Sequence, residues 1–251
     1  MGRCRGDVAD DRPPQAGPGG GIPVERRWLP LAATSGGLLV WSNLVVPALP
    51  PATGVRAVAN VGATAVLVLV ARRAGLTWAE FGVDRSTWRS GARWGGAALA
   101  AGAAGYLLAL TIPAARAAVV GLGPVDTSTG ELVARALVLI PIGVVLCEEV
   151  AFRGVLLAVA RRQLRVRSAL AVTSVVFGLW HVSTAVDDSR SAVSPILASA
   201  SVAGTVALTG LGGVVFAWLR LRSGSLLAPM GLHLATNSVG LLAAAAAVAA
   251  R

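Results

Sequence analysis

The chain has 251 residues, of which 55% are hydrophobic and only 14% are charged, and its formal net charge is +10. Soluble globular domains average about 45–50% apolar and about 25% charged residues, so this composition excludes an ordinary soluble domain. Several apolar runs reach the roughly 20 residues that a bilayer-spanning helix needs. These observations predict an all-α, polytopic membrane helix bundle in contact with the lipid bilayer. The positive charge is then expected on cytoplasmic loops, and we expect no nucleic-acid partner.

Residues 1–28 are rich in Gly, Pro, Arg and Asp and contain no apolar run. Such a segment cannot bury enough apolar surface to offset the entropy lost on ordering. We therefore predict a disordered cytoplasmic tail. The first apolar run begins only near Trp28, which is too late for the apolar core of a signal peptide.

From Trp28 onward, apolar runs predict about seven spanning helices, with six to eight as the range. Their expected positions are 29–49, 54–71, 92–113, 131–158, 168–184, 195–220 and 225–249. The segment 114–123 has room for a further half-helix. The segment 72–93 combines aromatic residues with arginines, which fits an interfacial segment with arginines reaching the headgroups. An ordinary cytoplasmic loop fits this segment equally well.

Capping signals support two of these helix starts. Ser128 and Glu131 have the spacing of a capping box at the start of the fourth helix. Ser194 followed by Pro195 places an N-cap and a first-turn proline at the start of the sixth helix. The predicted boundaries are thus consistent with local sequence.

Arginine accounts for all 22 basic residues, and 16 of them fall on one side of the predicted bundle against 4 on the other. By the positive-inside rule this predicts a cytoplasmic N-terminus. The absence of lysine, with abundant Ala, Gly and Val, is typical of a GC-rich genome. We therefore expect an integral protein of a bacterial plasma membrane.

Three ionisable residues, Glu148, Glu149 and Arg153, interrupt the fourth apolar run. A charge near mid-bilayer costs from about 3 to more than about 10 kcal/mol, so such groups usually serve function. Glu149 and Arg153 are four residues apart and can form an ion pair, whereas Glu148 points about 100° away and is free to act as a base. Pro141, two turns earlier, is expected to disturb the helix. The alternative is a charge cluster at the membrane interface.

The only two histidines, His181 and His233, both lie in predicted spanning helices. A lone buried histidine is more often a core residue than a ligand. Here each has a residue on the same helical face, Phe177 before His181 and Asn237 after His233. Helix geometry places both histidines and Glu149 at a similar membrane depth, which is expected of an enzyme or an ion pathway.

Glu148, His181 and His233 allow two chemistries. They could ligate Zn²⁺ with an open position for water, or Glu148 could deprotonate a water held by a histidine without a metal. Asn237 and one histidine could then donate hydrogen bonds to an oxyanion. The missing HExxH pairing argues mildly against a zincin-like site, but spacing alone leaves both chemistries open.

The motifs Glu148-Glu149-x-x-x-Arg153, Phe177-x-x-x-His181 and His233-x-x-x-Asn237 resemble those of the CPBP family, the CAAX protease and bacteriocin-processing group of intramembrane proteases. The resemblance covers roughly residues 130–240, and residues 76–83 resemble the loop that precedes the core in that family. It implies N-terminal membrane helices over 29–113 with the interfacial loop 72–93, and a catalytic core over 130–249.

The resemblance also implies residue roles. Glu148 would be the base, His181 and His233 would position water or a metal, and Asn237 would stabilise the oxyanion. Glu149 and Arg153 would support them. The substrate would be a peptide or a membrane protein.

Two other functions fit the same residues. A membrane scaffold or immunity protein of the same fold would keep the architecture without the reaction. A proton-coupled transporter would use intramembrane Glu, Arg and His as a relay, although the chain has no paired halves with matching broken helices.

Overall fold

The computed structural model describes residues 28–121 and 128–250, and this part of the chain forms helices and turns without a strand. Seven of its helical stretches are long and apolar enough to cross a membrane: Leu29–Ala48, Gly54–Arg73, Trp78–Thr111, Thr129–Arg161, Val166–Ser191, Pro195–Ser223 and Leu227–Ala249. The predicted all-α bundle of about seven membrane helices is thereby confirmed, and the protein is an integral membrane protein. The predicted tail lies, apart from Trp28, outside the described residues.

The spanning stretches consist of α-helices joined by short turns of π-helix. The α-helices used below are α2 (Leu29–Val40), α4 (Thr53–Arg73), α5 (Trp78–Phe81), α6 (Trp88–Thr111), α7 (Pro113–Val120), α8 (Thr129–Ala134), α9 (Cys147–Glu149), α10 (Leu157–Arg161), α11 (Val166–Trp180), α12 (Val182–Asp188), α13 (Pro195–Ser223), α14 (Leu227–Leu234) and α15 (Gly240–Ala249). The π-helical turns are Trp41–Val45, Arg135–Leu139, Pro141–Leu146, Val150–Leu156 and Ala235–Val239.

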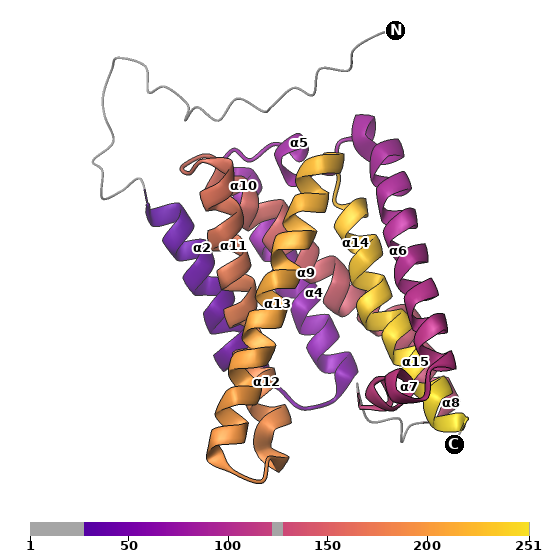
Figure 1. Cartoon of the computed structure of the whole chain (residues 1–251). Coiled ribbons are helices and arrows are strands. Elements are labelled where there is room, and N and C mark those ends of the chain that lie inside the picture. Colours follow the sequence, from indigo (N-terminus) through magenta and orange to yellow (C-terminus); the bar gives the residue numbers. More distant parts are fainter. Residues whose placement is uncertain (1–27, 122–127, 251) are drawn as a thin grey trace, which may run out of the picture.

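The bundle has two flanks with the fourth spanning stretch between them (Figure 1). On one flank α11 packs against α13, with α2 beside α11, and on the other flank α6 packs against α14. The stretch that contains α9 and α10 runs through the middle, and residues 151–160 within it are all buried. Glu148, Glu149 and Arg153 on this stretch are likewise buried.

Local signals behave largely as predicted. The half-helix expected within 114–123 is present as α7. Ser128 accepts a hydrogen bond from the backbone N–H of Glu131, and Ser194 accepts one from the N–H of Leu197 at the start of α13. Both predicted N-caps are confirmed.

Close contact between α6 and α14 depends on glycine. A Cβ atom on Gly231 would lie 2.1 Å from the backbone oxygen of Gly95, and one on Gly95 would lie 2.3 Å from the backbone oxygen of Leu227. Small residues of this kind allow membrane helices to approach closely, and van der Waals packing then stabilises their association. The same device joins α11 to α13, where a Cβ on Gly178 would lie 2.6 Å from the oxygen of Val206.

Gly231→Ala should therefore destabilise the fold, by about 1–3 kcal/mol as expected for overpacking. Gly96→Ala on α6 is the matched control, because Gly96 is exposed and a Cβ there meets nothing within 4 Å. Thermal unfolding in detergent measures both. Equal melting temperatures for the two variants would contradict the close-contact interpretation.

Candidate active site

The two glutamates lie on a locally irregular helix. Helix α9 carries Glu148 and Glu149 between the π-helical turns Pro141–Leu146 and Val150–Leu156. Pro141 has no N–H to donate, so the regular hydrogen-bond ladder is interrupted where the first of these turns begins. Single π-helical turns inside α-helices are frequent at functional sites.

Glu149 joins two other ionisable groups. Its Oε1 atom accepts a hydrogen bond from Arg153 Nη1 at 3.1 Å and lies 2.8 Å from His233 Nδ1. The glutamate is 0% exposed and the arginine 2% exposed, so this is a buried ion pair. The predicted pairing of Glu149 with Arg153 is confirmed, and the structure adds His233 to it.

Aromatic rings surround the buried arginine. The guanidinium carbon of Arg153 lies 4.0 Å from the ring centroid of Phe177 and 4.8 Å from that of Phe216. The Phe216 ring also stacks on His233, with centroids 4.9 Å apart. Cation–π attraction therefore compensates part of the lost hydration of the guanidinium and fixes its position.

Glu148 has a different environment. Its Oε1 atom accepts a hydrogen bond from Trp180 Nε1 at 3.2 Å, whereas its buried Oε2 atom has no hydrogen-bond partner among the described residues. Oε2 lies 3.8 Å from His233 Nε2, beyond direct hydrogen-bond distance. His233 thus lies between the two glutamates, with one ring nitrogen facing each.

His181 occupies a break in its helix. Helix α11 ends at Trp180 and α12 begins at Val182. His181 Nδ1 lies 2.8 Å from the carbonyl oxygen of Phe177, and the two rings are in contact with centroids 4.8 Å apart. In the described part of the chain, no hydrogen bond or ion pair joins His181 to Glu148 or His233.

Asn43 bridges this break from another helix. Its Nδ2 atom donates to the carbonyl oxygen of Leu179, and its Oδ1 atom accepts from the N–H of Ser183. Both backbone groups flank the break, so this side chain compensates for interrupted helical bonding. Intramembrane amides commonly have such a role.

Asn237 lies in the π-helical turn Ala235–Val239 and is half-buried. Its Oδ1 atom accepts a hydrogen bond from Thr236 Oγ1 at 3.3 Å. Its Nδ2 atom forms no hydrogen bond within the described residues. The amide therefore retains donors for a ligand, although no contact places it against Glu148.

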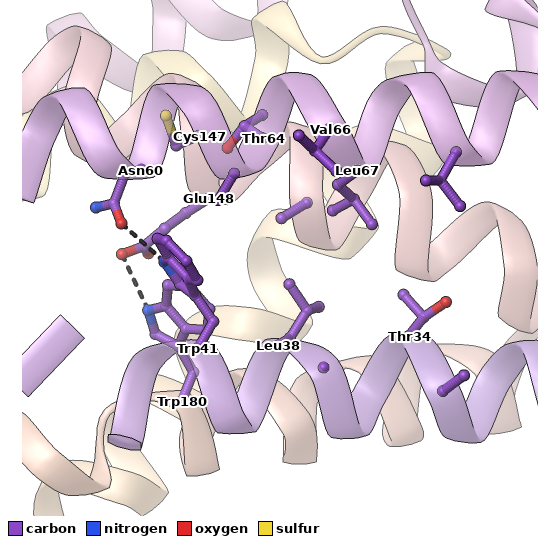
Figure 2. Close-up of a pocket in the computed structure, with 15 residues that line it drawn as sticks. Thr34, Leu38, Trp41, Asn60, Thr64, Val66, Leu67, Cys147, Glu148 and Trp180 are labelled. Carbon is purple, nitrogen blue, oxygen red and sulfur yellow. Dashed lines mark hydrogen bonds between the residues drawn. The ribbon is translucent and has the colours of Figure 1, made fainter. Parts of the chain in front are cut away.

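A cavity of about 540 Å³ leads to Glu148. It is enclosed mainly by α2 and α4, and Figure 2 shows Glu148 beside Trp41 and Trp180, with Leu38 and Leu67 further along. Trp41 Nε1 donates to Asn60 Oδ1, and Asn60 Nδ2 donates to the carbonyl oxygen of Gly143 in a π-helical turn. Glu148 is thus one of few charged or polar groups in an otherwise apolar chamber.

Sequence reasoning missed three side chains of this chamber, Trp41, Asn60 and Trp180, and also Asn43 at the break beside His181. The two asparagines carried a usable signal, because amides inside apolar helices are uncommon and usually bonded across helices. The tryptophans carried none, since exposed and buried indoles have the same sequence signature in a membrane helix.

The three side chains that could have held Zn²⁺, if a metal were used, are not assembled together: Glu148, His181 and His233. Among the described residues, no group of three or more His, Cys, Asp or Glu side chains is placed to hold a metal ion. Glu148 Oε2 and His233 Nε2 lie 3.8 Å apart, whereas His181 contacts Phe177. The chemistry below is therefore derived from the side chains alone.

A buried carboxylate that lines a cavity, with an imidazole 3.8 Å behind it, offers the groups that general acid–base catalysis uses. Residues 130–239 match the family described as "Type II CAAX prenyl endopeptidase Rce1-like". The sequence motifs resemble the same family, and the match supports peptidase activity in general. Comparisons with curated proteins and with solved structures gave no match.

Removing Arg153 should destabilise the protein strongly, because it leaves the Glu149 carboxylate buried without its cation. Arg153→Met is expected to lower the free energy of unfolding by about 3–5 kcal/mol. Adding Glu149→Gln should restore part of this loss. Unfolding of each variant in detergent measures the effect.

Arg135→Met is the matched control, because Arg135 pairs with Glu131 at 4.0 Å on a more exposed part of the same stretch. Its cost should stay below about 1 kcal/mol. If both variants lost the same free energy of unfolding, burial of the Arg153–Glu149 pair would contribute nothing to stability.

Proposed function

We propose that this protein is an intramembrane endopeptidase in which Glu148 activates a water molecule for attack on a peptide bond. The observation that carries the proposal is Glu148, which lines the cavity and whose buried Oε2 atom has no hydrogen-bond partner among the described residues and lies 3.8 Å from His233 Nε2. A free acceptor in such a place is costly unless a ligand or water satisfies it.

The pair Glu148 and His233 has the geometry to hold that water. A water oxygen about 2.8 Å from both Oε2 and Nε2 would form a triangle with the 3.8 Å separation as its base. His233 Nδ1 faces the Glu149 carboxylate and so carries the ring proton, which leaves Nε2 as an acceptor. The water then donates one hydrogen to each acceptor and directs its lone pairs toward the cavity.

The reaction follows from this arrangement. The water oxygen bonds to the scissile carbonyl carbon while one of its protons passes to Glu148. The carbon–nitrogen bond then breaks as Glu148 returns this proton to the departing amine. The products are a carboxylic acid, which contains the water oxygen, and a free amine, and Glu148 is again ionised.

The remaining candidate residues support this sequence. Asn237 supplies amide donors for the oxyanion of the tetrahedral intermediate. Glu149 and Arg153 hold His233 in one orientation, and Trp180 fixes the Glu148 carboxylate through Oε1. The His181 ring contacts Phe177, the same ring that packs against Arg153. His181 is proposed to position water or substrate.

The cavity favours an apolar substrate segment. Its walls on α2 and α4 are largely aliphatic, so a membrane-associated or secreted peptide could enter without exposing charge to the bilayer. The family description names a CAAX prenyl endopeptidase, whereas the bacterial origin that we infer from composition favours maturation of secreted peptides or processing of membrane proteins. We place the N-terminus in the cytoplasm on the basis of the arginine distribution.

Two alternatives lead to different outcomes. A scaffold or immunity protein would keep its phenotype when Glu148 loses its charge. A proton-coupled transporter would move substrate without breaking a covalent bond. The geometry favours the peptidase, because Glu148 lines the chamber and the His233 imidazole lies 3.8 Å from it, so the two groups meet at one point.

Glu148→Gln should lower the rate constant kcat by about 10²- to 10⁴-fold, the usual contribution of a general base. Cleavage of a quenched membrane-peptide library by purified protein in detergent measures the effect, with His233→Ala as a second site variant. Each should be assayed with and without a chelator and added Zn²⁺, because chelator inhibition reversed by Zn²⁺ would assign a metal to the site.

The control is Glu131→Gln, which removes an exposed carboxylate of α8 on the same spanning stretch. It should retain wild-type cleavage. Cleavage that persists in both the Glu148→Gln and the His233→Ala variants would contradict the proposed mechanism.

The cavity gives a separate prediction. Gly37→Phe should fill the chamber and lower kcat/KM by about tenfold or more, since pockets discriminate strongly on fit. Gly36→Phe should have little effect, because Gly36 does not line the chamber and, as at Gly37, a Cβ there meets nothing within 4 Å. Equal losses in both variants would show that α2 itself, and not the cavity, is sensitive.

A further inference from the structure

A second cavity lies away from the proposed active site, at the end of the bundle where α5, α10 and the C-terminal end of α13 meet (Figure 1). Its volume is about 230 Å³. The lining residues are Glu80, Leu157, Ala158, Arg161, Arg162, Arg220 and Leu221. Three arginines and one glutamate leave an excess of positive charge in this small space.

Arg220 is the central feature of this cavity. Its side chain is buried, with 6% exposed, yet no carboxylate among the described residues lies within 4.0 Å of it. Its Nη2 atom donates to the carbonyl oxygens of Ala79 and Glu80, and its Nε atom has no hydrogen bond there. A buried cation without a counter-ion is costly, so an anion from outside this part of the chain would stabilise it.

The other two arginines differ in their pairing. Arg162 bonds both carboxylate oxygens of Glu80, at 2.7 and 2.8 Å, and this pair consumes the single negative charge of the cavity. Arg161 is exposed and forms no ion pair within the described residues. Arg161 and Arg220 therefore remain available to one anion.

We propose that this cavity binds the phosphate group of an anionic phospholipid. Guanidinium groups bind phosphate through paired N–H donors, and basic pockets at the ends of membrane helices are suited to anionic headgroups. The cavity also has apolar walls at Leu157 and Leu221, which can contact the glycerol and upper acyl region.

Neighbouring residues place this cavity at the membrane surface. Trp78 on α5 and Trp88 at the start of α6 are both exposed, at 52% and 49%. Tryptophan is enriched at the level of lipid headgroups. A lipid phosphate therefore reaches Arg161 and Arg220 without leaving its normal depth.

Native mass spectrometry of the full-length protein in detergent tests this proposal. Phosphatidylglycerol should bind several-fold more tightly than phosphatidylcholine with the same acyl chains. Arg161→Gln and Arg220→Gln should each weaken phosphatidylglycerol binding about fivefold, as expected for one basic residue near an anionic surface. Arg167→Gln, an exposed position on α11 away from the cavity, is the matched control and should bind as wild type.

Arg161→Gln keeps the test decisive if Arg220→Gln fails to fold, because Arg161 makes no contact on which the fold depends. Equal phosphatidylglycerol binding by wild type and Arg161→Gln, or equal binding of the two lipids, would overturn the proposal. Inorganic phosphate bound as tightly as phosphatidylglycerol would identify a soluble anion as the ligand and overturn the lipid assignment. The readout is binding, so it does not depend on the proposed peptidase reaction.

Discussion

The shared hydrogen-bond acceptor Glu149 Oε1 is the point on which the site depends. It binds Arg153 from its own helix and His233 from α14, so it connects the central stretch to one flank of the bundle. Neither the Glu149 carboxylate nor the Arg153 guanidinium could be buried here alone, because an unpaired buried ion costs several kcal/mol. The position of His233, and through it the separation from Glu148, therefore follows from an ion pair that need not touch substrate.

Irregular backbone is the second constraint. The π-helical turns on either side of α9 and the break at His181 leave carbonyl and N–H groups that a regular helix would have used, and lipid cannot satisfy them. Asn60 bonds the carbonyl of Gly143, and Asn43 bonds groups on both sides of the break. The two amides thus stabilise the irregular segments that shape the chamber, which explains polar residues on helices that otherwise face lipid.

Much of this arrangement follows from sequence, because charge inside an apolar run is rare enough to identify a site. Composition and helical spacing were enough to predict the helices, the ion pair between Glu149 and Arg153, and His233 as a candidate site residue. The bond between His233 and Glu149 was not, because it depends on how α14 crosses the central stretch. Nor was the break at His181, since no proline marks it and its stabilising partner, Asn43, lies far away in sequence.

The two adjacent glutamates show how environment separates roles that sequence leaves equal. Glu149 is 0% exposed and accepts from a cation, which favours a fixed carboxylate. Glu148 lines the cavity and accepts one hydrogen bond from an uncharged indole; its Oε2 atom, like Oε2 of Glu149, has no hydrogen-bond partner among the described residues. Glu148 therefore faces the cavity without a cation beside it, whereas the Glu149 carboxylate is held by Arg153. The same contrast separates the two buried arginines: Arg153 has its counter-ion inside the fold, whereas Arg220 has none there and so is suited to bind an anion from outside.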